Sequence, residues 1–571
     1  MEKRIFIAVL ISIAFLWIWA AVAPKLFPDL VKPVAKPAVT STSGTSSTTA
    51  SSGATTSAGA SAATGAAPVT NPSAPAAVGT ATLAANAPTA TVAADAVKLT
   101  TIDNDEFTAV FSNRGAQLIS FQLKHYPRKP ADKKDASLVE LVKARDPHRI
   151  DFPFAIESAD ANFVRSVNSA LFSVSEQTQG DVTTLQYRWA QGGVSVTKTF
   201  RIGNQFLFDF SASVTPPIPY RVAIGPGIRT LDPEEKDSQF VFTGNGVVQR
   251  DDKLTVLRRE KGDHVNVYDS VQFIGVEDNY FLTALRPTKG SGAVLHAVDF
   301  PPIDPKSKDK RRELYAGISA GRDGVVAGEA FFGPKKTSLL DQYGLEKTLQ
   351  FGMFGIIGRF LLTVLVWINR TTHNYGWAII VLTIIIKIVL YPLQHKSIVS
   401  MKKMQRLQPK MEAIKNRYKK AKTDLQQRQK MNEEMMKLYQ VEGINPMSGC
   451  LPMVLQLPIL WGFYGLLSRA IELRGAPFLL WIQDLSAKDP FYITPILMTA
   501  TMFIQQWITP STVDPAQRRM FLIMPLVFGM IFKEFPSGLV LYWLVQNILT
   551  IVQQLIMNKY WKDHPTELQT A

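Results

Sequence analysis

The sequence predicts an α-helical membrane protein with several transmembrane helices and a separate all-β domain outside the membrane. Apolar residues fall in long uncharged blocks, one at the N-terminus and the others in the last third of the 571 residues. Between these blocks, short runs of strand-forming residues alternate with turn residues. The single cysteine, Cys450, excludes an internal disulfide framework and a cysteine-based metal site, and the seven histidines are scattered. We therefore expect no cofactor and no metal.

The first apolar block, Ile5–Ala23, predicts an N-terminal transmembrane anchor over residues 1–23. A helix of this length rises about 28 Å, which is close to the thickness of the hydrocarbon layer. Lys3 and Arg4 precede the block and place the N-terminus in the cytoplasm. A cleaved signal peptide is the alternative, because Ala21-Val22-Ala23 resembles a cleavage site.

Residues 24–96 predict a disordered linker, and residues 97–340 predict a β-sandwich. From Pro37 to Ala94 the linker has no charged residue and consists mostly of Ala, Ser, Thr, Pro and Gly, so it cannot bury enough apolar surface to fold. A plain spacer is the simplest interpretation, with O-glycosylation or cell-wall contact as alternatives. The strand signals of the β domain are Phe107–Phe111, Leu118–Leu123, Gly193–Phe200 and Phe206–Phe210, with turns at Asn113–Gly115 and Asn204. No catalytic constellation is visible in this domain, which favours a scaffold or a binding module.

Five further apolar blocks predict a five-helix core over residues 375–557. They are Tyr375–Leu393, Met447–Leu467, Phe491–Ile508, Met520–Phe532 and Pro536–Met557. With the anchor they make six transmembrane helices, so both termini lie on the cytoplasmic side, and residues 558–571 form a short C-terminal tail.

One more apolar block, Leu349–Ile368, either crosses the membrane or lies along its surface. The loop Gln394–Pro446 decides between these, because it holds thirteen Lys and Arg against five acidic residues and so belongs in the cytoplasm. If the block crossed the membrane, this loop would face outward. We therefore expect residues 345–370 to form an interfacial amphipathic helix.

The basic loop, residues 396–446, predicts a helical hairpin. Ile398, Met401, Met404, Leu407, Met411 and Ile414 recur at helical spacing, and Leu425, Met431, Met435 and Leu438 suggest a second helix after a turn at Lys419–Asp424. Two interpretations stay open: a hairpin packed on itself near anionic lipid, or a docking surface for an emerging apolar segment or a ribosome. Specific nucleic-acid binding is not expected, because aromatic residues are nearly absent from the loop.

Polar residues inside the predicted spans suggest a water-filled pocket. Lys387 costs about 3 kcal/mol at mid-membrane unless it reaches the surface or faces water, and Thr383 lies one turn away on the same face. Other spans contribute Gln456, Gln505, Gln506, Tyr542, Gln546 and Asn547, each of which could instead join two helices. No carboxylate lies in these spans, which argues against an ion pump, and no group is placed for covalent chemistry. We therefore expect a non-enzymatic polar groove that attracts acidic or polar segments.

Several stretches then point to a known family. They are Gly376–Pro409, Asn445–Pro452, Ala476–Ser486, Asp489–Leu497, Phe535–Tyr542 and the start of the β domain at Phe111–Gly115. Together they resemble the YidC family of membrane protein insertases, over the anchor, the outer domain and the five core spans. The resemblance implies a Gram-negative inner-membrane insertase and chaperone with a periplasmic β-supersandwich and a five-helix core, whose hydrophilic groove opens to cytoplasm and lipid.

The resemblance also implies roles for individual residues. Lys387 matches the basic residue of the groove, which is arginine in many members, and Thr383 matches a groove threonine. Gln506 matches a polar position of the fourth span, and Tyr542 and Trp543 match an aromatic pair that contacts clients; the second position is often tyrosine. With Gln456 these residues make up the expected substrate groove.

The implied partners are nascent inner-membrane proteins, the Sec translocon, membrane lipids and the ribosome. Because the tail is short, ribosome contact would fall on the hairpin, where we expect Met404, Arg406, Met411 and Met435 to contact clients or the ribosome. The expected function is insertion, folding and assembly of inner-membrane proteins without an energy source. A solute transporter with a sugar-binding-like outer domain is the first alternative, and a membrane-tethered assembly scaffold is the second.

Overall fold

The computed structural model describes residues 91–563, apart from gaps at 131–134, 136, 143–150, 230–241, 243, 260–264, 291, 302–310, 420–423, 444–450 and 510–514. The expected anchor, nearly all of the expected linker, the end of the tail and much of the expected hairpin turn lie outside the described residues.

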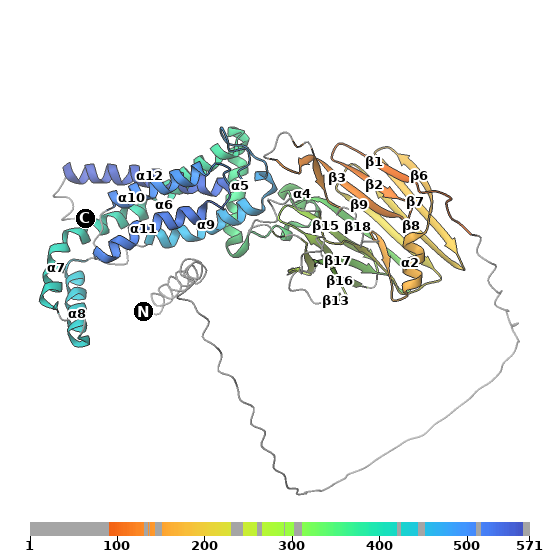
Figure 1. The fold of residues 1–571 in the computed structure, drawn as a ribbon, viewed down its shortest axis with the longest axis horizontal. Coiled ribbons are helices and arrows are strands. Elements are labelled where there is room, and N and C mark those ends of the chain that lie inside the picture. Colours follow the sequence, from red (N-terminus) through yellow and green to blue (C-terminus); the bar gives the residue numbers. More distant parts are fainter. Residues whose placement is uncertain are drawn as a thin grey trace, which may run out of the picture. The chain divides into compact units, whose positions relative to one another are not determined.

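The described strands of the β domain form three sheets, in which neighbouring strands are antiparallel (Figure 1). The first has the order β1 (Leu99–Asp103), β2 (Phe107–Ser112), β3 (Gln117–Pro127), β4 (Leu138–Glu140). The second has the order β13 (Val265–Tyr268), β16 (Gly292–Phe300), β17 (Arg311–Ser319), β10 (Arg221–Ile224), β5 (Ala155–Glu157). The third has the order β12 (Lys253–Leu257), β11 (Asn245–Arg250), β14 (Phe273–Glu277), β15 (Phe281–Lys289), β18 (Val325–Pro334), β9 (Leu207–Thr215), β8 (Val194–Ile202), β7 (Val182–Gln191), β6 (Ser173–Gln179).

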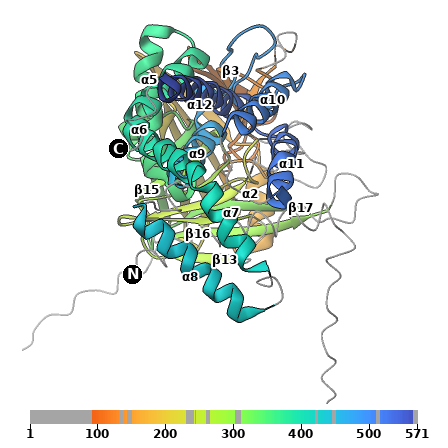
Figure 2. The same ribbon diagram turned by 90° about the vertical axis from the view of Figure 1, so that its left-hand side faces the viewer.

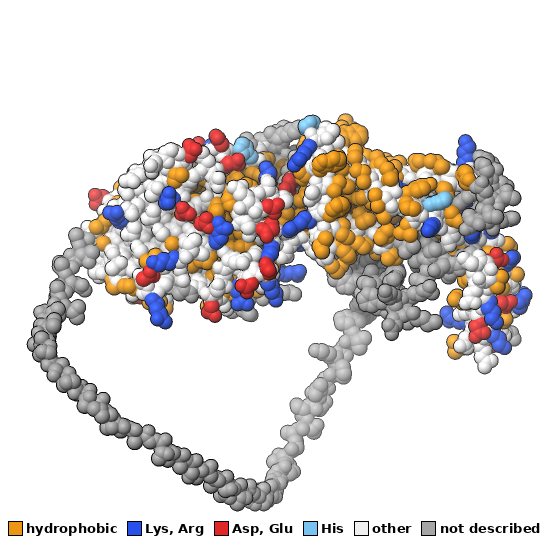
Figure 3. Space-filling model, turned by 180° about the vertical axis from the view of Figure 1, so that it is seen from behind, with side chains coloured by type: hydrophobic (Ala, Val, Ile, Leu, Met, Phe, Trp, Pro, Cys, Tyr) orange, Lys and Arg blue, Asp and Glu red, His pale blue; other side chains and the backbone are white. Residues whose placement is uncertain are grey.

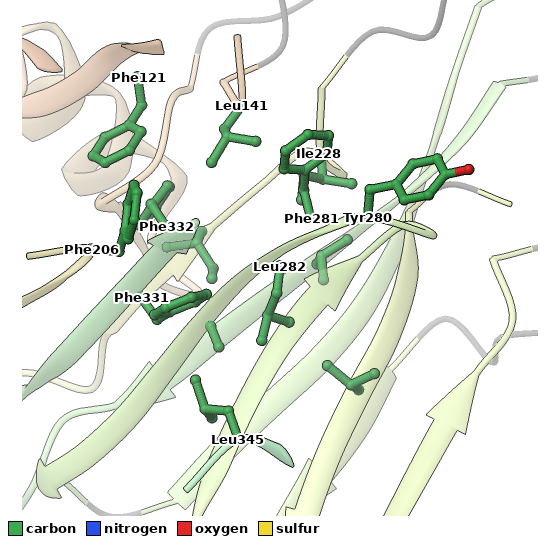
Figure 4. Packing of buried hydrophobic residues seen from close by; sticks show 14 of the residues in the cluster. Phe121, Leu141, Phe206, Ile228, Tyr280, Phe281, Leu282, Phe331, Phe332 and Leu345 are labelled. Carbon is green, nitrogen blue, oxygen red and sulfur yellow. The ribbon is translucent and has the colours of Figure 1, made fainter. Parts of the chain in front are cut away.

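The four strands expected from the sequence are confirmed as two antiparallel pairs, β2 with β3 and β8 with β9. In β9 the side chains of Phe208, Phe210 and Ala212 are buried and alternate with more exposed positions, as the period of a strand requires. Aromatic side chains fill the core; Figure 4 shows Phe121 near Phe332, with their ring centroids 5.4 Å apart. One helix, α2 (Ala161–Ser169), follows β5, with its N-terminus capped by Asp160.

The helical part follows β18. Its elements are α4 (Thr337–Tyr343), η1 (Glu346–Thr348), η2 (Gly352–Phe354), α5 (Gly355–Thr372), α6 (Tyr375–Arg406), α7 (Gln408–Arg417), α8 (Leu425–Val441), α9 (Leu451–Arg469), η5 (Ile471–Leu473), α10 (Ile493–Ile508), α11 (Pro515–Phe532) and α12 (Ser537–Asp563). Helix α12 packs against α6, α9 and α10, and α11 packs against α10. We call the end of this bundle where α9 finishes and α6 begins the β-domain end, and the end where α6 meets α7 the hairpin end.

Helix α5 contacts α6 and α9 and runs across their direction in Figure 1. Just before it, the carbonyl oxygen of Gln350 accepts a hydrogen bond from Arg469, at the end of α9. Its own last turn leads through His373 directly into α6. Both ends of α5 therefore lie near the β-domain end of the bundle.

Three described stretches are long and apolar enough to cross a membrane, judged by length and composition. They are Gly352–Thr372, which includes α5, then Tyr375–Arg406 and Ser537–Tyr560. Hydrophobic side chains cover much of the helical part in Figure 3, whereas charged residues are scattered over the β domain. The expected number of six spans stays a prediction.

The hairpin differs from the sequence-based expectation in its first arm. The apolar positions predicted one helix, but α6 ends at Arg406 and α7 starts at Gln408. Pro409 accounts for the break: proline has no backbone N–H to donate, and its ring clashes with the preceding turn, so it is best tolerated in the first turn of a helix, where α7 places it. Figure 2 shows α7 and α8 side by side, with the second arm starting at Leu425 as expected.

Candidate functional site in the helical bundle

Helix α12 carries a polar face formed by Tyr542, Gln546 and Thr550. Residues four apart lie on the same side of a helix, so these three side chains follow one line along α12. Each of them makes a hydrogen bond to α6 or α9. We call Tyr542, Gln546 and Thr550, with their partners Gln456 and Lys387, the polar track.

Lys387 enters the track from α6. Its Nζ donates a hydrogen bond to the hydroxyl of Thr550 at 2.9 Å, and the residue is only 8% exposed. The Thr550 hydroxyl in turn donates to the carbonyl oxygen of Gln546 at 2.7 Å. Among the described residues no ion pair includes Lys387, so its ammonium group is hydrogen-bonded to a neutral oxygen rather than paired with a carboxylate.

Gln456 connects the track to α9. Its Nε2 donates to the Tyr542 hydroxyl, and its Oε1 lies 3.5 Å from Nε2 of Gln546. The ring of Tyr542 is fully buried and stacks on Phe463 of α9, with the centroids 4.3 Å apart. Within the described part of the chain, the amide oxygen of Gln546 is buried and accepts no hydrogen bond. A small opening of the bundle would let it accept one.

The other expected groove residues lie off the track. Thr383 is fully buried, and its hydroxyl donates to the carbonyl oxygen of Ile379 in its own helix at 2.6 Å. Trp543 faces α11, where its ring packs on Phe528 and Phe532.

Gln506 is half-buried on α10. Helix α10 instead reaches α12 through other side chains: Thr501 accepts from Asn547, and Thr509 and Gln554 are hydrogen-bonded.

Sequence reasoning missed Thr550, although a signal was present. Thr550 lies four residues after Gln546 and eight after Tyr542, both of which were already singled out. A search for polar residues at intervals of four along one span would have found it.

The hairpin residues separate into a core and a surface. Met411 is buried between α7 and α8, with Met404 and Met435 packed against the same cluster. The hydroxyl of Tyr439 lies 3.7 Å from the Met411 sulfur, and Lys410 pairs with Glu442 at 2.7 Å. Arg406 is exposed. In this conformation Met411 stabilises the hairpin itself, as the self-packed interpretation expects.

A half-buried arginine ties the β-domain end of the bundle to the β domain. Arg474, after α9, donates from both terminal nitrogens to the carbonyl oxygens of Pro127 and Arg128, each at 2.9 Å. Within the β domain, Lys335 pairs with Glu277 at 2.9 Å, with both side chains almost fully buried. Burial raises the pKa of the Glu277 carboxyl, and the Lys335 charge offsets part of that rise. The helices that carry the track are therefore held from one end.

No group of three or more His, Cys, Asp or Glu side chains in the described part of the chain could hold a metal ion. The track offers hydroxyls, amides and one ammonium group. Such groups can hydrate and attract a polar segment by hydrogen bonding and charge.

Comparisons with known proteins cover both parts of the chain. The family model described as 60Kd inner membrane protein matches residues 367–564, and the model of the YidC periplasmic domain matches residues 99–364. Membrane protein insertase YidC of Geobacter metallireducens is 35% identical, over 98% of this chain and 98% of its own. The chain belongs to the YidC family of membrane protein insertases.

A second curated relative agrees with this assignment. Membrane protein insertase YidC of Citrifermentans bemidjiense is 36% identical, over 99% of this chain and 100% of its own. A crystal structure of an active YidC insertase with its first transmembrane domain resolved shares 18% identity over 81% of this chain and 94% of that one, with a TM-score of 0.35.

Membership of the YidC family settles the broad function. The chain is an inner-membrane insertase of membrane proteins, and its mostly β domain is periplasmic. The expected family, activity and membrane are thereby confirmed. The solute transporter finds no support among the relatives.

Proposed function

We propose that the polar track is the path by which this YidC-family chain takes up the polar part of a client during insertion. The observation that carries the proposal is the bond between Lys387 and Thr550, which holds a buried cation against a neutral oxygen at one end of the track. A client carboxylate is a better partner for an ammonium group than a hydroxyl is. An acidic client segment is therefore attracted to this point.

The energetics of the proposal follow from desolvation. A polar side chain that enters hydrocarbon alone loses its hydrogen bonds to water, which costs several kcal/mol. The amides and hydroxyls of Gln456, Gln546 and Thr550 replace some of those bonds. The apolar part of the client then moves into lipid, gaining about 25 cal/mol per Å² of buried apolar surface. No energy source is required.

The proposal includes a topology with six spans, cytoplasmic termini and a five-helix core attached to a β-supersandwich. Helix α5 lies along the periplasmic surface rather than across the membrane, which is supported by the position of both its ends near the β-domain end. The hairpin is then cytoplasmic, where its excess of Lys and Arg favours contact with ribosomes and anionic lipid. The remaining partners of the proposal are nascent clients and the Sec translocon.

Site-specific photocrosslinking tests the proposed path. A photoreactive residue replaces Gln546 on the track, and ribosomes carry a stalled single-span client of increasing length. A matched control replaces Ile356, which is highly exposed on α5 but lies off the track. We expect crosslinks at position 546 once the apolar segment has emerged, their loss after release, and no comparable crosslinks at position 356.

Three results would count against this path. Equal crosslinking at both positions would indicate general surface contact. Crosslinks only from an exposed hairpin residue such as Met436 would show that clients contact the hairpin but do not enter the polar track. A chaperone role would then remain without the proposed path. Solute flux through the purified protein, together with no crosslinks at positions 546, 356 and 436, would favour a transporter.

A further inference from the structure

The segment between α9 and α10 forms a compact turn with two leucines at its tip. The backbone N–H of Phe478 donates to the carbonyl oxygen of Ile482 at 3.0 Å, and that of Ile482 donates to Leu479 at 3.1 Å. The side chain of Gln483 donates to the carbonyl oxygen of Leu480 at 2.7 Å. Hydrogen bonds on both sides of Leu479-Leu480 therefore fix the tip.

The tip places apolar side chains where the protein does not cover them. Leu480 is 80% exposed and Leu479 is 46% exposed. Leu480 also has a φ of +54°, in the left-handed region that glycine and asparagine adopt more readily than leucine. A leucine here loses free energy in its backbone, and the described part of the chain leaves most of its side chain uncovered. An apolar environment outside the chain would bury this side chain favourably.

The position of the tip indicates which environment that is. Asn374, the N-cap of α6, donates to the carbonyl oxygen of Phe478 at 3.2 Å, so the tip lies beside the β-domain end of α6. The half-exposed ring of Trp377 packs edge-on against Phe478, with the centroids 5.8 Å apart. Tryptophan at the end of a membrane helix is typical of the boundary between lipid headgroups and hydrocarbon.

The segment that carries the tip has both exposed apolar residues and an exposed ion pair, a mixture that is found where a protein crosses a membrane boundary. Phe491, which precedes α10, and Ile496 of α10 are also exposed apolar residues. At the base of the segment, Lys488 lies 3.4 Å from Glu534 in an exposed ion pair. Figure 3 shows that the helical part as a whole presents an apolar surface. The segment thus combines exposed leucines at its tip, beside the start of the apolar helix α6, with a charged pair at its base.

We propose that the Leu479-Leu480 tip inserts into the membrane leaflet on the β-domain side, at the boundary between headgroups and acyl chains. The partner is the lipid surface itself. The tip acts as a side anchor that fixes the depth of the segment between α9 and α10. This contact goes beyond client insertion and does not depend on the polar track.

Depth-dependent fluorescence quenching tests this contact in the full chain. The only cysteine is first removed as Cys450→Ser, and Leu479→Cys then carries an environment-sensitive dye. The protein is reconstituted into vesicles of phosphatidylcholine and phosphatidylglycerol, with doxyl groups placed near the headgroup or deep in the acyl chain. A dye at Lys488→Cys is the matched control in the same loop.

We expect headgroup-proximal doxyl lipid to quench the dye at position 479 at least twofold more than the dye at position 488, and aqueous iodide to show the reverse order. Equal iodide quenching at both positions would overturn the proposal, because the tip would then lie in water. Protection of position 479 from both quenchers would overturn it too, because protein would then cover the tip.

A second variant separates the side chain from the backbone. Leu480→Asn suits the left-handed backbone but removes the apolar side chain, whereas Leu480→Met keeps an apolar side chain. We expect the asparagine variant to lower doxyl quenching at position 479 at least twofold and the methionine variant to leave it unchanged. Unchanged quenching in Leu480→Asn would show that Leu480 is not the anchor.

Discussion

Asn279, in the turn between β14 and β15, donates a hydrogen bond from Nδ2 to the carbonyl oxygen of Ser468 in the last turn of α9, at 2.8 Å. Its Oδ1 accepts from the backbone N–H of Phe242 at 2.9 Å. The residue is 1% exposed, and both the nitrogen and the oxygen of its buried side-chain amide are hydrogen-bonded. A single residue of the β domain thus holds the end of a helix that contributes Gln456 to the polar track.

Asn279→Ala is expected to loosen this end of α9. Both groups bonded to the amide lose a partner, and we expect a loss of about 2 kcal/mol in the free energy of unfolding. Hydrogen–deuterium exchange should accelerate around Ser468. The exposed Asn162 of α2 provides the control, since Asn162→Ala should leave that exchange unchanged. Unaltered protection in Asn279→Ala would mean that other contacts hold α9.

Thr550→Val is expected to slow client insertion several-fold, and Thr550→Ser is expected to be close to wild type. Valine has nearly the shape of threonine but no acceptor for Lys387, so the ammonium group loses a hydrogen bond in a buried site. Proteoliposomes with the purified chain and a single-span client give the rate. Wild-type rates in Thr550→Val would show that this pair has no role in insertion.

Lys387→Met is expected to affect acidic clients most. At about 8 Å and an effective dielectric constant of about 20, the attraction between an ammonium group and a carboxylate is about 2 kcal/mol. We therefore expect at least a tenfold loss for a client with one Asp in its translocated segment, and a smaller loss for the Asn counterpart. Lys387→Arg should preserve the difference between the two clients. A uniform loss for both clients would contradict the electrostatic role.

Lys198 makes the stability of the β domain depend on pH. Its Nζ donates to the carbonyl oxygens of Gly115 and Phe154 at 2.6 and 2.7 Å. Burial lowers the pKa of Lys198 from 10.5 to about 7. Between these two values the unfolded chain binds more protons than the folded chain, so this lysine makes folding more favourable as pH rises. The gain is at most about 1.4 kcal/mol per pH unit.

Denaturant unfolding of the full chain from pH 7 to 10, followed by the circular dichroism of its strands, measures this effect. Lys198→Met is expected to remove the part of the slope due to this lysine. Exposed Lys253, at the start of β12, gives the control variant Lys253→Met, which should keep the slope. Identical slopes in wild type and Lys198→Met would contradict the lowered pKa.

Met411→Ala is expected to destabilise the hairpin by about 2 kcal/mol, because it removes buried apolar volume between α7 and α8. Limited proteolysis should then cut this region faster. Met436→Ala, at an exposed position of α8, should leave proteolysis unchanged. Equal protection in both variants would mean that Met411 does not hold the two arms together.

Strand pairs and most helices could be predicted because local patterns determine them. Asn113–Gly115 marked the turn between β2 and β3, and the apolar blocks marked α6 and α12. The break at Leu407 was missed because the apolar spacing continues through it, while Pro409 acts on the backbone rather than on the pattern of side chains.

The site was predicted less completely because sequence cannot assign a hydrogen bond to one of several partners. Thr383 and Lys387 share a face of α6, but the threonine bonds to its own backbone while the lysine reaches α12. Adjacent residues on a helix point about 100° apart. Trp543 consequently faces α11, although Tyr542 beside it belongs to the track.

The neutral partner of Lys387 has a consequence for turnover. A cation locked to a buried carboxylate would have to break a strong ion pair each time a client arrived, and would re-form it only slowly. A hydroxyl is a partner that an incoming acidic group displaces and that recaptures the ammonium group after departure. On the proposed path, the resting bond of Lys387 with Thr550 would thus favour rapid exchange of occupants and a short dwell time for each client.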